Sequence, residues 1–94
     1  MSIIATARHI LVRSESECNF LKKKLENGAD FAETAASFSA CSSAKEGGDL
    51  GSFSPCQMEK EIDRVAFNCE IGPIHGPIKT QFGYHLLQIQ SRSA

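Results

Sequence analysis

Two histidines near opposite ends of the chain, His9 and His85, are the side chains whose type and position suggest chemistry. Alternate residues of a strand share a face, so His9 falls with Leu11 and His85 falls with Leu87. If the two strands are neighbours in one sheet, both rings lie on its inner side. Because a neutral imidazole has one donor and one acceptor, the two rings could form a hydrogen-bonded pair that anchors other polar groups. On residue types alone, a purely structural role explains such histidines at least as well.

Both histidines require strands to position them. Residues 76–80 and 84–90 are β-prone runs on either side of Gly83, and a glycine between two such runs predicts a tight hairpin. Residues 3–12 are also rich in β-formers and predict a first strand that ends near Arg13.

Three helices are predicted between these strands. Capping boxes at Ser14 with Glu17 and at Asp30 with Glu33 start the first two, and the third covers roughly residues 59–68. Each has an apolar stripe at helical spacing: Cys18, Leu21 and Leu25 in the first, Phe31, Ala35 and Phe38 in the second, and Met58, Ile62, Val65, Ala66 and Cys69 in the third.

A glycine-rich stretch, residues 39–51, separates the second helix from a short predicted strand at residues 52–54. Its glycines suit a shaped loop that turns Leu50 inward, and they do not form a phosphate-binding loop because no Gly-Lys-Ser/Thr follows. The element order is β-α-α-β-α-β-β. It predicts an α+β fold in which helices cover a mostly antiparallel sheet.

Composition limits the classes of function. With 94 residues the chain forms a single domain, residues 1–94, and its net charge of −1 without a broad basic field argues against nucleic acid and membrane partners. The four cysteines have no C-x-x-C spacing, so we expect free thiols and no metal site. The N-terminus lacks the pattern of a signal peptide, and we expect a cytoplasmic location, a monomer and no cofactor.

Six short motifs in order resemble one family across nearly the whole chain. They are RHILV at 8–12, FSACSSA at 38–44, GGDLGSF at 47–53, QM at 57–58, GP at 76–77 and FGYH at 82–85. The chain resembles the parvulins, small single-domain peptidyl-prolyl cis-trans isomerases. The resemblance implies a four-stranded sheet, wrapped by about three helices, whose concave face holds the proline of a substrate.

The resemblance also implies the roles of individual residues. The catalytic set would be His9, Cys41, Thr80 and His85, and the substrate-binding set would be Leu50, Gln57, Met58, Ile62 and Phe82. The chain departs from the usual pattern at three positions. Ile62 stands where parvulins commonly have phenylalanine, Ala40 where many have an acidic residue, and Phe82 where some have serine.

The predicted substrate is a proline-containing peptide or an unfolded protein segment. Parvulins that require phosphorylated substrates carry a basic cluster after the first strand, but residues 13–17 here hold one arginine and two glutamates. A phosphate dianion needs several cationic contacts, so we expect an apolar or neutral residue before the proline, and a non-covalent mechanism. The alternative is a module that binds proline segments, or a chaperone-like holdase, with little turnover.

Overall fold

The computed structural model describes residues 3–40 and 42–93 of the 94-residue chain. A four-stranded antiparallel sheet with strand order β2-β1-β4-β3 forms its centre. The strands are β1 (Ala5–Val12), β2 (Asp49–Phe53), β3 (Ile74–Thr80) and β4 (Gly83–Arg92). The helices are α1 (Glu15–Glu26), α2 (Phe31–Phe38) and α3 (Lys60–Asn68), with a 3-10 helix, η1, at Ser42–Glu46. The α+β fold expected from the sequence is confirmed.

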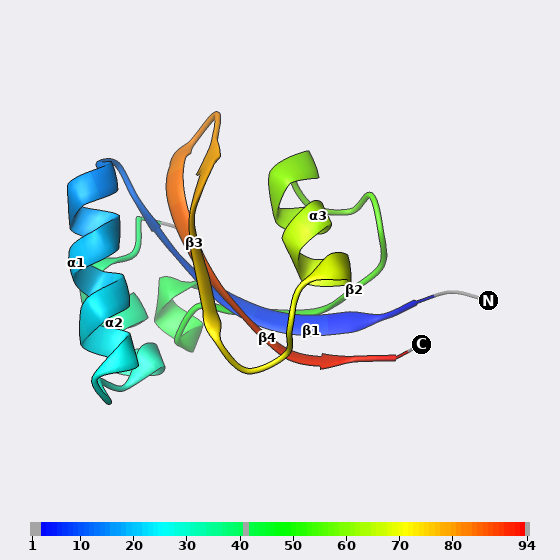
Figure 1. Ribbon diagram of the computed structural model, residues 1–94, viewed down its shortest axis with the longest axis horizontal. Coiled ribbons are helices and arrows are strands. Elements are labelled where there is room, and N and C mark those ends of the chain that lie inside the picture. The colour runs from blue at the N-terminus through cyan, green and yellow to red at the C-terminus, as the bar shows by residue number, and fades with distance from the viewer. Residues whose placement is uncertain (1–2, 41, 94) are drawn as a thin grey trace.

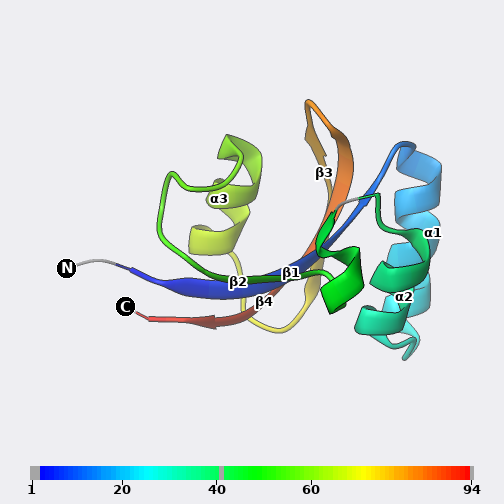
Figure 2. The same cartoon turned by 180° about the vertical axis from the view of Figure 1, so that it is seen from behind.

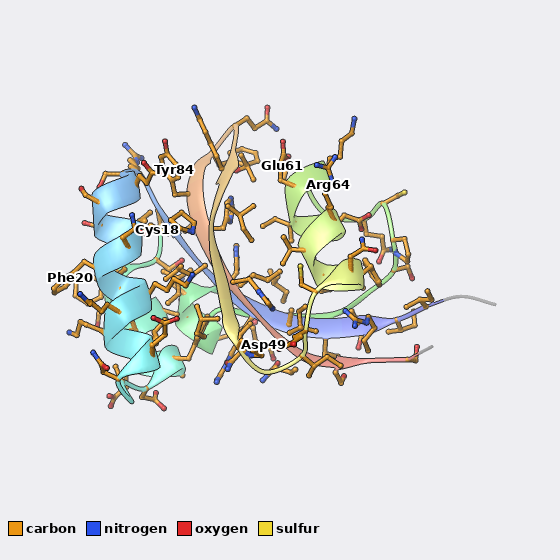
Figure 3. The ribbon with its side chains drawn as sticks, viewed as in Figure 1. Cys18, Phe20, Asp49, Glu61, Arg64 and Tyr84 are labelled. Atoms are coloured by element: carbon orange, nitrogen blue, oxygen red, sulfur yellow. The ribbon has the colours of Figure 1, made fainter. Side chains whose placement is uncertain are left out.

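Helices cover both faces of the sheet, and each face has its own apolar core (Figure 1). On one face α1 and α2 pack on a cluster of Ile10, Val12, Cys18, Leu21, Leu25, Phe31, Ala35 and Leu86. On the other face α3 packs on Ala5, Ala7, Phe53, Ile62, Ala66, Leu87 and Ile89. We call these the reverse face and the α3 face. Figure 3 shows the two sides of α1, with Cys18 on the side toward the sheet and Phe20 on the outer side.

The two central strands come from opposite ends of the chain. The pairing of β1 with β4 runs from Ala5 opposite Arg92 to Val12 opposite Tyr84. The chain termini consequently lie close together at one end of the sheet (Figure 2). There the backbone N–H of Ile4 donates to Ser93 Oγ over 2.9 Å.

The helices begin where the capping signals predict. Ser14 Oγ accepts from the N–H of Glu17 at 3.1 Å, and Asp30 Oδ2 accepts from that of Glu33 at 2.9 Å. Glu59 occupies the N-cap position of α3 but makes no side-chain cap hydrogen bond. None of the helices in the described ranges is long and apolar enough to cross a membrane.

The predicted bounds of the four strands and one predicted core residue were wrong. The fourth strand covers Gly83–Arg92 instead of residues 84–90. The second strand covers Asp49–Phe53 instead of residues 52–54, and the glycine-rich stretch before it contains η1. The third strand begins at Ile74 instead of residue 76, and the first begins at Ala5 instead of residue 3. Phe38, expected on the buried stripe of α2, is 45% exposed because α2 ends there, and the Lys24 ammonium lies over its ring.

Candidate functional site

The register of the central strands brings the two histidines together on the α3 face. His9 lies opposite Leu87, and His85 lies opposite Leu11, so the histidines are diagonal neighbours on adjacent strands. Their Nδ1 atoms are 3.2 Å apart, and the rings stack with centroids 5.3 Å apart and planes inclined by 15°. The predicted meeting of the two imidazoles is confirmed.

Thr80, at the end of β3, extends this pair into a hydrogen-bonded chain. Its Oγ1 lies 2.7 Å from His85 Nε2 and accepts from the backbone N–H of Phe82 at 3.2 Å. The hydroxyl has one proton, and when it donates that proton to His85 Nε2, every group in the chain is used once. With that assignment of protons, His85 donates from Nδ1 to His9 Nδ1, and His9 has its proton on Nε2.

Burial keeps both rings neutral. His9 is 6% exposed and His85 is 3% exposed. Desolvation, reinforced by the neighbouring His85, lowers the pKa of His9 from 6.5 to about 4. Desolvation also lowers the pKa of His85, against an opposing effect of the negative charge of Glu61. At neutral pH the pair therefore acts through hydrogen bonds and not as a positive charge.

The pair forms part of the wall of a cavity of about 320 Å³ on the α3 face, which we call the groove. The described residues that line the groove are His9, Leu11, Leu50, Gln57, Met58, Glu59, Ile62, Phe82 and His85. They come from β1, β2, the segment before α3, α3 itself, the β3–β4 turn and β4. Apolar side chains dominate, and the histidine nitrogens and the Gln57 amide are the uncharged polar groups. The arrangement suits a small apolar ring attached to a polar backbone.

Each predicted substrate-binding residue lines the groove: Leu50, Gln57, Met58, Ile62 and Phe82. Of the predicted catalytic residues, His9 and His85 line it, while Thr80 contacts it through His85. Cys41 lies outside the described residues. Ile62 is 3% exposed and belongs to the core of the α3 face as well as to the groove wall.

Two residues of the groove were missed in the sequence, Leu11 and Glu59. Leu11 could have been found, because it follows His9 by two positions in a strand and must share its face. Glu59 gives no such signal, because a glutamate before a helix is ordinarily a solvated N-terminal charge.

A backbone contact fixes His9 from the glycine-rich loop. The N–H of His9 donates to the carbonyl of Gly48 at 2.9 Å, and Gly48 adopts a φ of +83°. A Cβ at position 48 would collide with the His9 carbonyl oxygen. The position therefore demands glycine, both for its backbone conformation and for the close approach of the two segments.

A second cavity, of about 490 Å³, lies on the reverse face and includes Arg8, Phe31 and Gln88 in its lining. The Arg8 guanidinium lies 4.6 Å over the Phe31 ring, and its Nε donates to Gln88 Oε1 at 2.8 Å. We place the candidate site in the smaller groove, because the buried polar chain is found there. Within residues 3–40 and 42–93, no three His, Cys, Asp or Glu side chains gather as a metal-ligand group.

Comparison with known proteins gives a consistent result. The family model described as Rotamase, the PPIC-type PPIase domain, matches residues 9–91. The chain is 47% identical over 88 residues to the foldase protein PrsA of Exiguobacterium sibiricum, and the match covers 92% of this chain and 29% of that protein. It is 40% identical over 87 residues to PrsA of a Geobacillus species, covering 92% of this chain and 32% of the relative. The chain thus spans about a third of the length of these curated relatives.

Solved structures give the same picture. The crystal structure of the peptidylprolyl isomerase PrsA from Bacillus anthracis has a TM-score of 0.94 at 36% identity, over 99% of this chain and 43% of that one. The parvulin of Nitrosopumilus maritimus has a TM-score of 0.84 at 37% identity, over 95% of this chain and 97% of that one.

Proposed function

The chain belongs to the parvulin family of peptidyl-prolyl cis-trans isomerases, in its PPIC-type form, and on that premise we propose that it accelerates rotation about X-Pro bonds whose preceding residue carries no phosphate. The substrate is a proline-containing peptide or an exposed protein segment, and rotation proceeds without a covalent intermediate. The observation that carries the proposal is the neutral His9–His85–Thr80 chain in the wall of an apolar groove.

The energetic task is modest. Amide resonance opposes rotation with a barrier of about 20 kcal/mol, which gives uncatalysed times of ~10–100 s. Because each ~1.4 kcal/mol is tenfold in rate, a reduction of about 5–6 kcal/mol brings the step to milliseconds. No bond has to be broken and no proton has to leave the substrate.

The groove supplies two contributions to this reduction. The planar amide has a larger dipole than the twisted amide because resonance separates charge across it, so a dry apolar wall favours the twisted form relative to water. Leu50, Met58 and Ile62 provide that wall around the proline ring. Interactions that are stronger in the twisted state than in the planar state are those that raise the rate.

The histidine pair contributes order and polarity. A chain of hydrogen bonds from the Phe82 N–H through Thr80 and His85 to His9 holds both rings in fixed orientations. Fixed dipoles next to the amide need no reorganisation as it twists, which is the condition for electrostatic stabilisation of a transition state. The lowered pKa values keep a positive charge off the two rings, where it would favour the more polar planar amide.

The charges of the groove support an unphosphorylated substrate. None of its described lining residues is lysine or arginine, and Glu59 is acidic. Arg13, after β1, is exposed and is followed by Glu15 and Glu17. A phosphate dianion would find no cluster of charge-assisted donors among these residues.

A non-covalent route assigns Cys41 a supporting role. A covalent route would need thiolate attack on the prolyl carbonyl and collapse without hydrolysis. We expect Cys41→Ser to retain part of the activity, whereas complete loss with an intact fold would favour the covalent route.

A binding module with little turnover is the second candidate, and Ile62 favours it. An aliphatic side chain stacks less well on a pyrrolidine ring than the phenylalanine common in the family. The two candidates differ in turnover, because a holdase would bind proline peptides without changing their isomerisation rate.

A protease-coupled assay on Ala-Ala-Pro-Phe peptides tests the proposal. Chymotrypsin cleaves the trans peptide, so an isomerase shortens the slow phase in proportion to its concentration. We expect acceleration by the wild type, a large loss in His85→Asn and no loss in His75→Asn, whose ring lies outside the groove with Nε2 2.7 Å from the Glu70 carbonyl. An unchanged slow phase at all enzyme concentrations would reject isomerisation.

Location and oligomeric state stay predictions. The described cysteines Cys18, Cys56 and Cys69 are free thiols, and burial raises the pKa of the Cys18 thiol to about 11. Free thiols support a reducing compartment such as the cytoplasm. Cell fractionation tests the location, and light scattering tests whether the chain is a monomer.

A further inference from the structure

Glu59 gives the groove an acidic rim. It is the only residue with a formal charge among the nine described residues that line the groove. Glu59 is half-buried at the start of α3, and Gln81 in the β3–β4 turn donates to its Oε2 over 3.4 Å. This carboxylate therefore lies where the hairpin and the helix approach each other across the groove.

The position of Glu59 is not explained by the stability of α3. It occupies the N-cap position, where Ser, Thr, Asp or Asn would satisfy the first free N–H groups of the helix. Its side chain makes no cap hydrogen bond, and its contact with Gln81 is long. The carboxylate is thus held beside the groove with most of its hydrogen-bonding capacity unused.

A second carboxylate, that of Glu61, adds to the negative potential, while the cation of the residue before it, Lys60, is exposed to solvent. Figure 3 shows Glu61 on the first turn of α3, on the side of that helix nearer to the β3–β4 hairpin than Arg64. The charge of Glu61 also acts on the His85 ring, at the groove wall. Lys79 does not oppose this negative potential. It lies opposite Tyr84 in the β3–β4 register, so the two side chains share a face, and Tyr84 packs on the reverse-face core.

We propose that Glu59, assisted by Glu61, makes the groove select substrates that carry lysine or arginine directly beside the proline. The proposal rests on the proposed isomerase function and specifies its substrate class. A basic side chain can replace Gln81 as the partner of the Glu59 carboxylate while the proline ring enters the apolar part of the groove. An acidic side chain at the same place meets like charge.

The size of the effect follows from a charge pair at the edge of solvent. Two opposite charges ~4 Å apart interact by about 1 kcal/mol in bulk water and by more near a protein surface, which corresponds to about fivefold or more in kcat/KM. Salt screens such a pair, with a Debye length of about 10 Å at 0.1 M. A preference of this origin must therefore shrink as the ionic strength rises.

The test compares peptides of the form Ala-Xaa-Pro-Phe, with lysine, alanine or glutamate at Xaa, by NMR exchange of the cis and trans proline signals. A second series keeps alanine before the proline and varies the residue after it, which shows on which side the basic group binds. We expect kcat/KM for lysine to exceed that for glutamate by about fivefold in at least one series at low salt. Equal values in both series overturn the proposal.

Variants separate the carboxylate from the rest of the groove. Glu59→Gln keeps the shape, so the lysine-to-glutamate ratio should fall toward unity, and Glu59→Lys should invert it. Glu33→Gln removes an exposed glutamate on α2, away from the groove, and should leave the ratio unchanged. A ratio that survives in Glu59→Gln overturns the proposal.

The alanine peptide keeps the two proposals distinguishable. If it is accelerated and the ratio is unity, isomerisation stands and the preference fails. If no peptide is accelerated, isomerisation fails, and the affinities of the lysine and glutamate peptides, measured by NMR titration, then decide whether the acidic rim selects its ligand.

Discussion

Acidification should destabilise the fold through the histidine pair before ordinary carboxylates begin to titrate. His9 has a pKa of about 4 in the folded chain against 6.5 for an unperturbed histidine. Between these values the unfolded chain binds more protons than the folded chain, so the free energy of unfolding falls as the pH falls. The contribution is fully present above 6.5 and is lost progressively toward about 4.

The expected loss is measurable. Two-state linkage with these two pKa values gives a loss of about 2 kcal/mol from His9 alone between about pH 7.5 and pH 5. His85 adds to it, because its pKa is lowered as well. Small domains have only about 5–15 kcal/mol of stability in total, so the loss is a considerable fraction.

Urea denaturation followed by circular dichroism at several pH values measures this loss. At about pH 5, the lowest pH of the series, the pH is still above the ordinary pKa values of Asp and Glu, so most carboxylates stay ionised. His9→Asn should have a clearly shallower dependence on pH, and His75→Asn should have the same dependence as the wild type. A wild-type stability that is flat over this range, or a slope as steep in His9→Asn as in the wild type, would refute the account of a buried neutral pair.

Three substitutions, one of them with a control variant, test other parts of the structure. Thr80→Val should cost about 1–3 kcal/mol of stability and should also lower kcat/KM. Thr34→Val, the control, removes a hydroxyl hydrogen bond from another buried threonine and should lower stability alone. Equal kcat/KM values in the two variants would contradict the positioning role of Thr80. Ile62→Ala should cost about 2–4 kcal/mol in urea and weaken peptide binding, and unchanged binding would remove it from the groove wall. Gly48→Ala should lower stability by at least ~1 kcal/mol in a thermal melt, and a neutral result would contradict its close approach to His9.

Local patterns in the sequence were enough to predict the faces of the site. The two-residue period of a strand placed His9 and His85 on apolar faces, and the helical spacing placed Ile62 and Ala66 in the core. These predictions succeed because burial of one face decides which side chains point inward. The family resemblance added Leu50, Gln57 and Phe82, which no periodicity would have connected with the histidines.

Long-range pairing decided what the sequence could not show. Asp49–Phe53 is a strand despite its glycine because it pairs with β1, where Ala7 lies opposite Gly51. Tertiary pairing of this kind overrides weak local propensity. The contact between the two Nδ1 atoms depends on the register of β1 against β4, and a register shifted by one residue would place the rings on opposite faces.

The most direct test of the account is NMR exchange spectroscopy on a single unphosphorylated proline peptide, with the chemical shifts of the protein recorded in the same titration. The account predicts faster exchange between the cis and trans signals and shift changes concentrated at His9, Leu50, Met58 and His85, around the groove. Cis–trans exchange at the uncatalysed rate, even though the chemical shifts of these residues change, would contradict it. Shift changes confined to the reverse face around Arg8 and Phe31 would also contradict it.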